Sequence, residues 1–360
     1  MVNYQNILIA RDYRGITQKQ LADGIGGLSQ GTLSRIEKGL YQVADDVLQE
    51  IAKVLDFPVT FFYKETPKYP AFYFNYRRRA TMPQKKLIQL EAYFDIMRMA
   101  IDELGRSVDI PEYKLPVVAP NEKLTPEDIA NRVRCFMRLK RGPIDNLINS
   151  LELNGIVVCM VPIDNDQFDG ITMITNSNYR IIFINDNLSN DRKRFSIGHE
   201  LGHLIMHDPD VIDDKSMDDK EKEANKFSAE FNMPKIDCFN DLKGLRFADL
   251  GMLKQRWYLS KAAIIYRAKE LHTIQENTAK YYQMQLSAAG ERKVEKGFVP
   301  LDTPKIIQKM VQAHLDELGY SVAELSYILG LNQEDFNKYL GSKSSENIVR
   351  IKPIFFKRDD

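Results

Sequence analysis

Apolar residues recur at two different spacings along this chain. Up to about residue 65, and again after Asp191, they fall three or four positions apart, as on one face of an α-helix. Between Gly155 and Asn185, runs of β-branched and aromatic residues predict strands at 156–161, 171–174 and 179–184. Because 176–178 reads as a turn, we expect a small antiparallel sheet. The fold class is therefore mainly α with a small β-sheet, in which an α+β middle domain lies between helical ends.

A long helix is predicted from about Gln84 to Leu104. Its apolar positions alternate between spacings of three and four residues over almost three heptads, which is typical of a seam between helices. Such a seam packs either within its own domain or against a second copy of the chain, so a homodimer is one expectation. The seam residues are Leu87, Leu90, Phe94, Met97, Ile101 and Leu104.

Residues 17–39 have the pattern of two short helices joined by a tight glycine turn. Thr17 and Gln20 match a capping box that begins the first helix, Ser29 begins the second, and Gly39 suits its end. The pattern fits either a simple helical hairpin or a helix-turn-helix, whose second helix enters the major groove of DNA. The candidate DNA contacts are Gln18, Lys19, Ser29, Gln30, Thr32, Arg35 and Lys38.

These positions resemble the XRE family of lambda-repressor-like regulators over roughly residues 5–62. The resemblance rests on Thr17-Gln18, Leu21-Ala22, Ser29 and the run 33–39, followed by apolar residues at 48, 51, 52 and 55. It favours the helix-turn-helix over the simple hairpin, and it implies a double-stranded DNA operator as partner. Gly26-Gly27 adds one residue to the turn that is usual in the family.

The run His199-Glu200-Leu201-Gly202-His203 is an HExxH motif. Residues four apart share one face of a helix, so both imidazoles could bind one zinc ion, with Glu200 as the general base beside it. His207 is not expected to join His199 on the same ion, because eight helical positions rise about 12 Å. We expect His207 to lie behind the ligands or in the cleft.

The third ligand is expected on a following helix that begins at Ser216. A Glu about 20 residues after the second His, on a helix of its own, is the gluzincin arrangement. Glu223 is the preferred candidate, while Glu221 and Glu230 stay open.

Several separated stretches resemble the ImmA/IrrE family of zinc metallo-endopeptidases over about residues 125–275. They are residues 143–147, 168–170, 194–203, 223–234 and 259–267. The resemblance implies one zinc ion on His199, His203 and Glu223, with Glu200 catalytic. It also implies a protein substrate, typically a repressor or antitoxin whose removal relieves control in a stress response or a mobile element.

These patterns predict that the chain has four regions. Residues 1–65 are the helix-turn-helix domain, 66–120 a basic aromatic linker and the long helix, 121–285 the gluzincin-like zinc peptidase domain, and 286–360 a C-terminal helical domain. The last part repeats the helix-turn-helix rhythm from a capping box at Ser321, but residues 321–341 hold three acidic residues and only one lysine. We therefore expect it to bind a protein partner or a second copy rather than DNA.

Composition and charge refine this picture. Three scattered cysteines without CxxC spacing suit a reducing cytosol, and no apolar run approaches the ~20 residues of a membrane span, so we expect a cytoplasmic protein without a membrane partner. The net charge of zero hides a basic linker: residues 64–86 hold 7 basic residues and 1 acidic one. We expect Arg77, Arg78 and Arg79 to supply much of the contact with phosphates.

Two functions fit this sequence. One is a DNA-binding transcriptional regulator whose zinc endopeptidase domain cleaves a repressor or antitoxin. The other is a non-cleaving DNA-binding antitoxin or repressor of a toxin–antitoxin or phage-defence pair, whose zincin domain binds a partner or senses a ligand. In both cases we expect the protein substrate or toxin partner to be encoded nearby.

Overall fold

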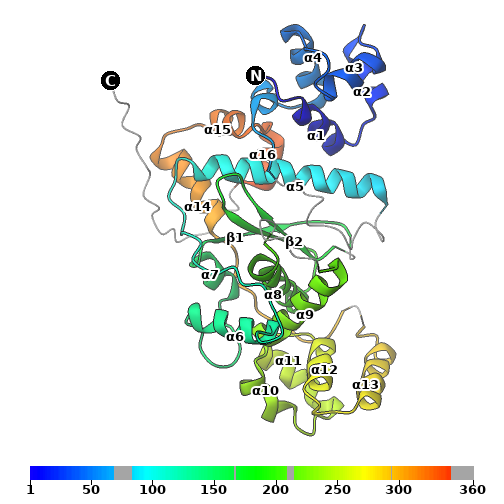
Figure 1. Ribbon diagram of the computed structural model, residues 1–360, viewed down its shortest axis with the longest axis vertical. Coiled ribbons are helices and arrows are strands. Elements are labelled where there is room, and N and C mark those ends of the chain that lie inside the picture. Colours follow the sequence, from blue (N-terminus) through cyan, green and yellow to red (C-terminus); the bar gives the residue numbers. More distant parts are fainter. Residues whose placement is uncertain (69–82, 166–167, 209–214, 293, 342–360) are drawn as a thin grey trace. The chain divides into compact units, whose positions relative to one another are not determined.

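The computed structural model describes residues 1–68, 83–165, 168–208, 215–292 and 294–341 (Figure 1). It is mainly helical with one three-stranded sheet, as predicted. The chain forms two compact units. Unit 1 contains Met1–Pro111, Met173–Ile181 and the described residues from Lys305 on, and unit 2 contains Glu112–Thr172 and Ile182–Pro304. The boundary near residue 304 divides the predicted C-terminal part, so that its first residues belong to unit 2.

The amino-terminal domain lies in unit 1 and has the predicted helix-turn-helix. Thr17 and Gln20 form the capping box at the start of α2, and the Ser29 hydroxyl accepts from the Thr32 amide at the start of α3. Gly26 and Gly27 have φ values of 66° and 80°, a conformation that side chains other than glycine rarely adopt. The elements are α1 (Tyr4–Arg14), α2 (Gln18–Ile25), α3 (Gln30–Glu37), α4 (Asp45–Leu55) and the 3₁₀ helix η1 (Val59–Tyr63).

The predicted long helix is α5 (Gln84–Gly105), also in unit 1. Its seam is filled within the chain: Phe94, Met97, Ile101 and Leu104 are fully buried, and α1, α14 and α15 contact the helix. The interpretation of the seam as internal packing is thus confirmed. The seam therefore gives no support to a homodimer, which stays a prediction.

The C-terminal helices pack on α5 and on the chain's own helix-turn-helix domain. They are α14 (Ile306–Gln312), the π-helical turn η5 (Ala313–Glu317), α15 (Val322–Leu329) and α16 (Gln333–Tyr339), and Ser321 forms the predicted capping box. The Asp335 carboxylate accepts from the Tyr13 hydroxyl at 2.9 Å and from the Arg14 guanidinium at 3.0 Å. This face of the helix pair α15–α16 is thus occupied within the chain, and the binding of a partner by this part stays a prediction.

The sheet consists of β1 (Ile156–Val161), β2 (Gly170–Ile174) and β3 (Arg180–Asn185), in the order β1-β3-β2. β2 and β3 form the predicted antiparallel hairpin. However, the Asp186 amide donates to the Val161 carbonyl at 2.8 Å, which brings the carboxyl ends of β1 and β3 together. Those two strands are parallel, so the prediction of a wholly antiparallel sheet is wrong. Strand patterns show which residues are buried but not the direction of pairing.

The remaining helices belong to unit 2. Two lie before β1, α6 (Pro126–Phe136) and α7 (Leu147–Glu152), and Thr125 forms a capping box with Asp128 at the start of α6. The others are α8 (Asn190–Met206), α9 (Met217–Asn232), α10 (Lys235–Leu242), the 3₁₀ turn η4 (Phe247–Asp249), α11 (Leu250–Trp257), α12 (Lys261–Glu270) and α13 (Glu276–Ala288). No helix in the described part of the chain is long and apolar enough to cross a membrane.

Candidate metal centre

Two glycines of α8 allow α9 to approach it closely. A Cβ atom on Gly198 would lie 2.5 Å from Asn232 Nδ2 and 2.8 Å from Ser228 Oγ, and one on Gly202 would lie 3.1 Å from the Phe227 ring. Residues larger than glycine would push the two helices apart. The close packing explains how a side chain of α9 reaches the HExxH residues of α8.

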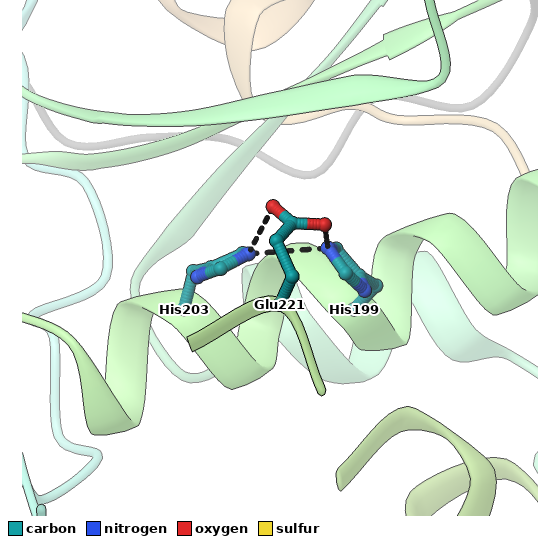
Figure 2. Close-up of side chains that lie close together, drawn as sticks. All are labelled: His199, His203 and Glu221. Carbon is teal, nitrogen blue, oxygen red and sulfur yellow. Dashed lines mark hydrogen bonds and ion pairs between the residues drawn. The ribbon is translucent and has the colours of Figure 1, made fainter. Parts of the chain in front are cut away.

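His199 and His203 of α8 and Glu221 of α9 converge on one point (Figure 2). The Nε2 atoms of the two imidazoles are 3.1 Å apart, and the Glu221 carboxylate oxygens lie 3.6 Å from His199 Nε2 and 3.5 Å from His203 Nε2. Two nitrogen ligands of a tetrahedral zinc ion are separated by roughly 3.3 Å. Two imidazoles and one carboxylate are also a common zinc ligand set, so these residues fit the metal.

Glu221 stands where the sequence prediction has Glu223. The two side chains are two positions apart on α9, so they point about 200° apart around the helix axis. Glu223 turns instead to His207, at 2.9 Å, and to Lys215, at 2.6 Å. This geometry favours Glu221 over the predicted Glu223 as third ligand, because only one of two such neighbours can face the histidine pair.

Glu230, the remaining candidate, is held elsewhere in unit 2. Its carboxylate pairs with the Arg267 guanidinium and accepts from the Asn131 amide at 2.9 Å. Its side chain is almost fully buried, so these contacts serve the packing of α9 against its neighbours.

Asn225 orients His199, and the sequence reasoning missed this residue. The Asn225 Oδ1 atom lies 3.0 Å from His199 Nδ1 and can only accept, so Nδ1 carries the proton and Nε2 presents its lone pair. Asn225 is one helical turn after Glu221, on the same face of α9. That spacing is a signal by which the sequence could have identified it.

His207 lies behind His203, as predicted, and not at the metal position. Its Nδ1 atom is 2.9 Å from His203 Nδ1. Burial, and then the neighbouring His203, lower the pKa of His207 to about 4. His207 is therefore a neutral imidazole near pH 7.

Glu200 is buried between α8 and the sheet. Its backbone carbonyl accepts from the Thr172 hydroxyl of β2 at 2.9 Å. A Cβ atom on Gly170, at the start of β2, would lie 3.1 Å from Glu200 Cγ and 2.9 Å from the Phe183 carbonyl oxygen. Glycine at position 170 thus leaves room for the Glu200 side chain beside the strand.

Most of the predicted DNA contacts lie on the surface of the helix-turn-helix. Lys19, Ser29, Gln30, Arg35 and Lys38 are exposed. The Thr32 hydroxyl lies 2.9 Å from Ser29 Oγ, and the Gln18 amide donates to Glu37 at 2.6 Å, so these two side chains are engaged within the domain. Arg77, Arg78 and Arg79 lie outside the described residues.

Tyr41, four residues after the end of α3, is a further surface residue that the sequence reasoning did not single out. Its side chain is half exposed, and the Arg35 guanidinium lies 5.7 Å from the centre of its ring. The aromatic ring therefore limits where the Arg35 side chain can point.

Two protein-family models match the chain, each over a separate stretch. A helix-turn-helix model matches residues 7–62, and the model of peptidase family M78, described as an IrrE N-terminal-like domain, matches residues 152–269. The chain joins a helix-turn-helix domain to an IrrE-like domain. No curated protein matches the chain.

The IrrE-like domain contains the whole candidate metal centre, because β1–β3, α8 and α9 lie within the matched residues. It is a metallopeptidase-like domain, and its His and Glu residues form a group that can hold a metal ion. The helix-turn-helix domain extends from α1 to η1 and contains the exposed polar residues of α2 and α3.

Proposed function

We propose that this chain is a DNA-binding transcriptional regulator whose IrrE-like domain is a zinc-dependent endopeptidase. Its substrate is a regulatory protein of the repressor or antitoxin type, cleaved in a stress response or in the control of a mobile element. The observation that carries the proposal is the convergence of His199, His203 and Glu221 beside the buried Glu200.

His199, His203 and Glu221 would hold the ion. When bound, zinc supplies Lewis acidity to the scissile carbonyl and lowers the pKa of the attacking water. The chain's own contribution is to fix the ligands: Asn225 orients His199, and the close packing of α8 on α9 brings Glu221 to the pair.

Glu200 is the proton carrier of the proposed reaction. It follows the ligand His199 directly on α8, so its carboxylate can take a proton from the attacking water and deliver it to the leaving amine. Glu200 is buried, with its Cγ atom beside Gly170, so its side chain has little contact with bulk water. Glu200→Gln should therefore abolish hydrolysis while zinc stays bound.

DNA binding by the helix-turn-helix domain is the second half of the proposal. Exposed Gln30, Arg35 and Lys38 are available to base edges and phosphates of a double-stranded operator. The affinity for DNA should fall steeply as salt is raised, and a flat salt response would contradict it.

The peptidase is tested with three purified proteins: wild type, Glu200→Gln, and Glu122→Gln as an exposed control with the same chemical change. Each is assayed for zinc and incubated with the product of the adjacent gene. Zinc-dependent loss of that product with wild type and the control, but not with Glu200→Gln, supports the proposal. A stable stoichiometric complex with all three favours the non-cleaving partner instead.

A further inference from the structure

Four side chains form a continuous line behind the candidate metal position. Lys215 Nζ lies 2.6 Å from Glu223 Oε1, Glu223 Oε2 lies 2.9 Å from His207 Nε2, and His207 Nδ1 lies 2.9 Å from His203 Nδ1. His203 Nε2 then faces His199 and Glu221. The line thus begins at a lysine and ends at the atom that would bind the metal.

The direction of each hydrogen bond follows from the groups involved. A carboxylate can only accept, so Glu223 accepts one hydrogen bond from Lys215 and another from His207 Nε2. When the Nε2 atom of His203 binds a metal ion, the one hydrogen of its ring is on Nδ1. His207 Nδ1 lies 2.9 Å from that atom and accepts the hydrogen, while His207 Nε2 donates to Glu223.

We propose that Lys215, Glu223 and His207 are positioning residues: His207 accepts the Nδ1–H of His203, and the line of contacts orients His203 Nε2 toward the metal position. The inference deepens the proposed function, because His203 matters there as a ligand. An outer group that fixes the tautomer of a ligating histidine also fixes the plane of its ring.

The surroundings of this line make it rigid. The His207 side chain is only 4% exposed, so it has little freedom to turn away from His203. Lys215 also donates to the Pro120 carbonyl at 3.0 Å, which ties the charged end of the line to a segment before α6. Both ligating histidines are thus oriented, His199 by the Asn225 amide and His203 by an ion pair acting through a second imidazole.

The hydrogen bond between the two rings can be read in the zinc-loaded protein. The chain has five histidines, so long-range ¹H–¹⁵N spectra contain few imidazole signals. We expect the Nδ1 proton of His203 to exchange slowly with water in wild type and faster in His207→Leu. Equal exchange rates in the two zinc-loaded proteins would overturn the proposal.

Zinc affinity gives a second readout that does not depend on activity. In competition with a chromogenic chelator, His207→Leu should bind zinc about 10–100-fold more weakly than wild type. His207→Gln, which keeps one acceptor and one donor, should restore most of the affinity. Asp218→Asn removes an exposed acid from the same helix and should leave the affinity unchanged.

The outcomes separate this inference from the proposed peptidase. Unchanged zinc affinity in a folded His207→Leu protein, with the fold checked by circular dichroism, would overturn the positioning role. If wild type shows the slow exchange of the His203 Nδ1 proton and the expected zinc affinity but cleaves no protein, the positioning role stands and the peptidase proposal fails.

Discussion

Glu221 and Glu223 lie two positions apart on α9 and contact different histidines of α8. An oxygen of Glu221 is 3.5 Å from His203 Nε2, whereas an oxygen of Glu223 is 2.9 Å from His207 Nε2. The helical rotation between the two positions assigns one carboxylate to the proposed metal and the other to the residue behind it. The two carboxylates should therefore respond differently to the same substitution.

Glu221→Gln should bind zinc far more weakly than Glu223→Gln, because it removes the carboxylate charge from the ligand set itself. The Glu223 variant loses only an outer contact, which costs about 10–100-fold in affinity. Chelator competition on both purified proteins measures the difference. If Glu223→Gln were the more severely impaired, Glu223 and not Glu221 would be the ligand.

Gly198→Ala should destabilise unit 2, because its Cβ would lie 2.5 Å from Asn232 Nδ2 and 2.8 Å from Ser228 Oγ. Overpacking of this kind costs about 1–3 kcal/mol. Urea unfolding followed by the fluorescence of Trp257, the chain's one tryptophan and a buried residue of unit 2, measures the loss.

Gly251→Ala is the matched control for this substitution. Gly251 is also helical, but a Cβ there would meet nothing within 4 Å. The substitution should leave stability unchanged or raise it by about 0.5–1 kcal/mol, since glycine is the poorer helix former. Equal effects of the two alanines would mean that α8 and α9 are not closely packed at Gly198.

The sequence contained enough local information to predict where the helices of both candidate sites, for DNA and for the metal, begin. Capping residues such as Thr17, Ser29 and Ser216 act within one turn, so they mark where α2, α3 and α9 begin. The spacing of His199 and His203 likewise predicts a shared face from the helical repeat alone.

The remaining features depend on contacts between distant residues. Spacing from the second histidine cannot distinguish Glu221 from Glu223, because the rotation of α9 against α8 is set by the glycine packing between them. β1 pairs with β3 in parallel, and Asp335 bonds to Tyr13. In both cases the two segments are far apart in the sequence, and the residue pattern of one does not indicate that it contacts the other.

Asp335→Ala should loosen the C-terminal hairpin. The carboxylate is buried and accepts from Tyr13 and Arg14, so its removal leaves two polar groups with fewer partners, at a cost of about 1–3 kcal/mol. Hydrogen exchange of the α16 backbone amides measures the free energy of local opening. Glu334→Ala, the exposed neighbour on the same helix, should change it little.

Lys38→Ala should weaken DNA binding about equally for specific and unrelated sequences. Lys38 is the exposed C-cap of α3, within reach of a phosphate when that helix lies in the major groove. Loss of one phosphate contact lowers the slope of log affinity against log salt by about 1. A salt titration of operator binding by fluorescence anisotropy measures this slope. Lys280→Ala is the control, because it removes the same charge from an exposed position of α13 in unit 2. If the salt-dependence slope fell equally in both variants, the effect would be general electrostatic attraction and not a contact made by α3.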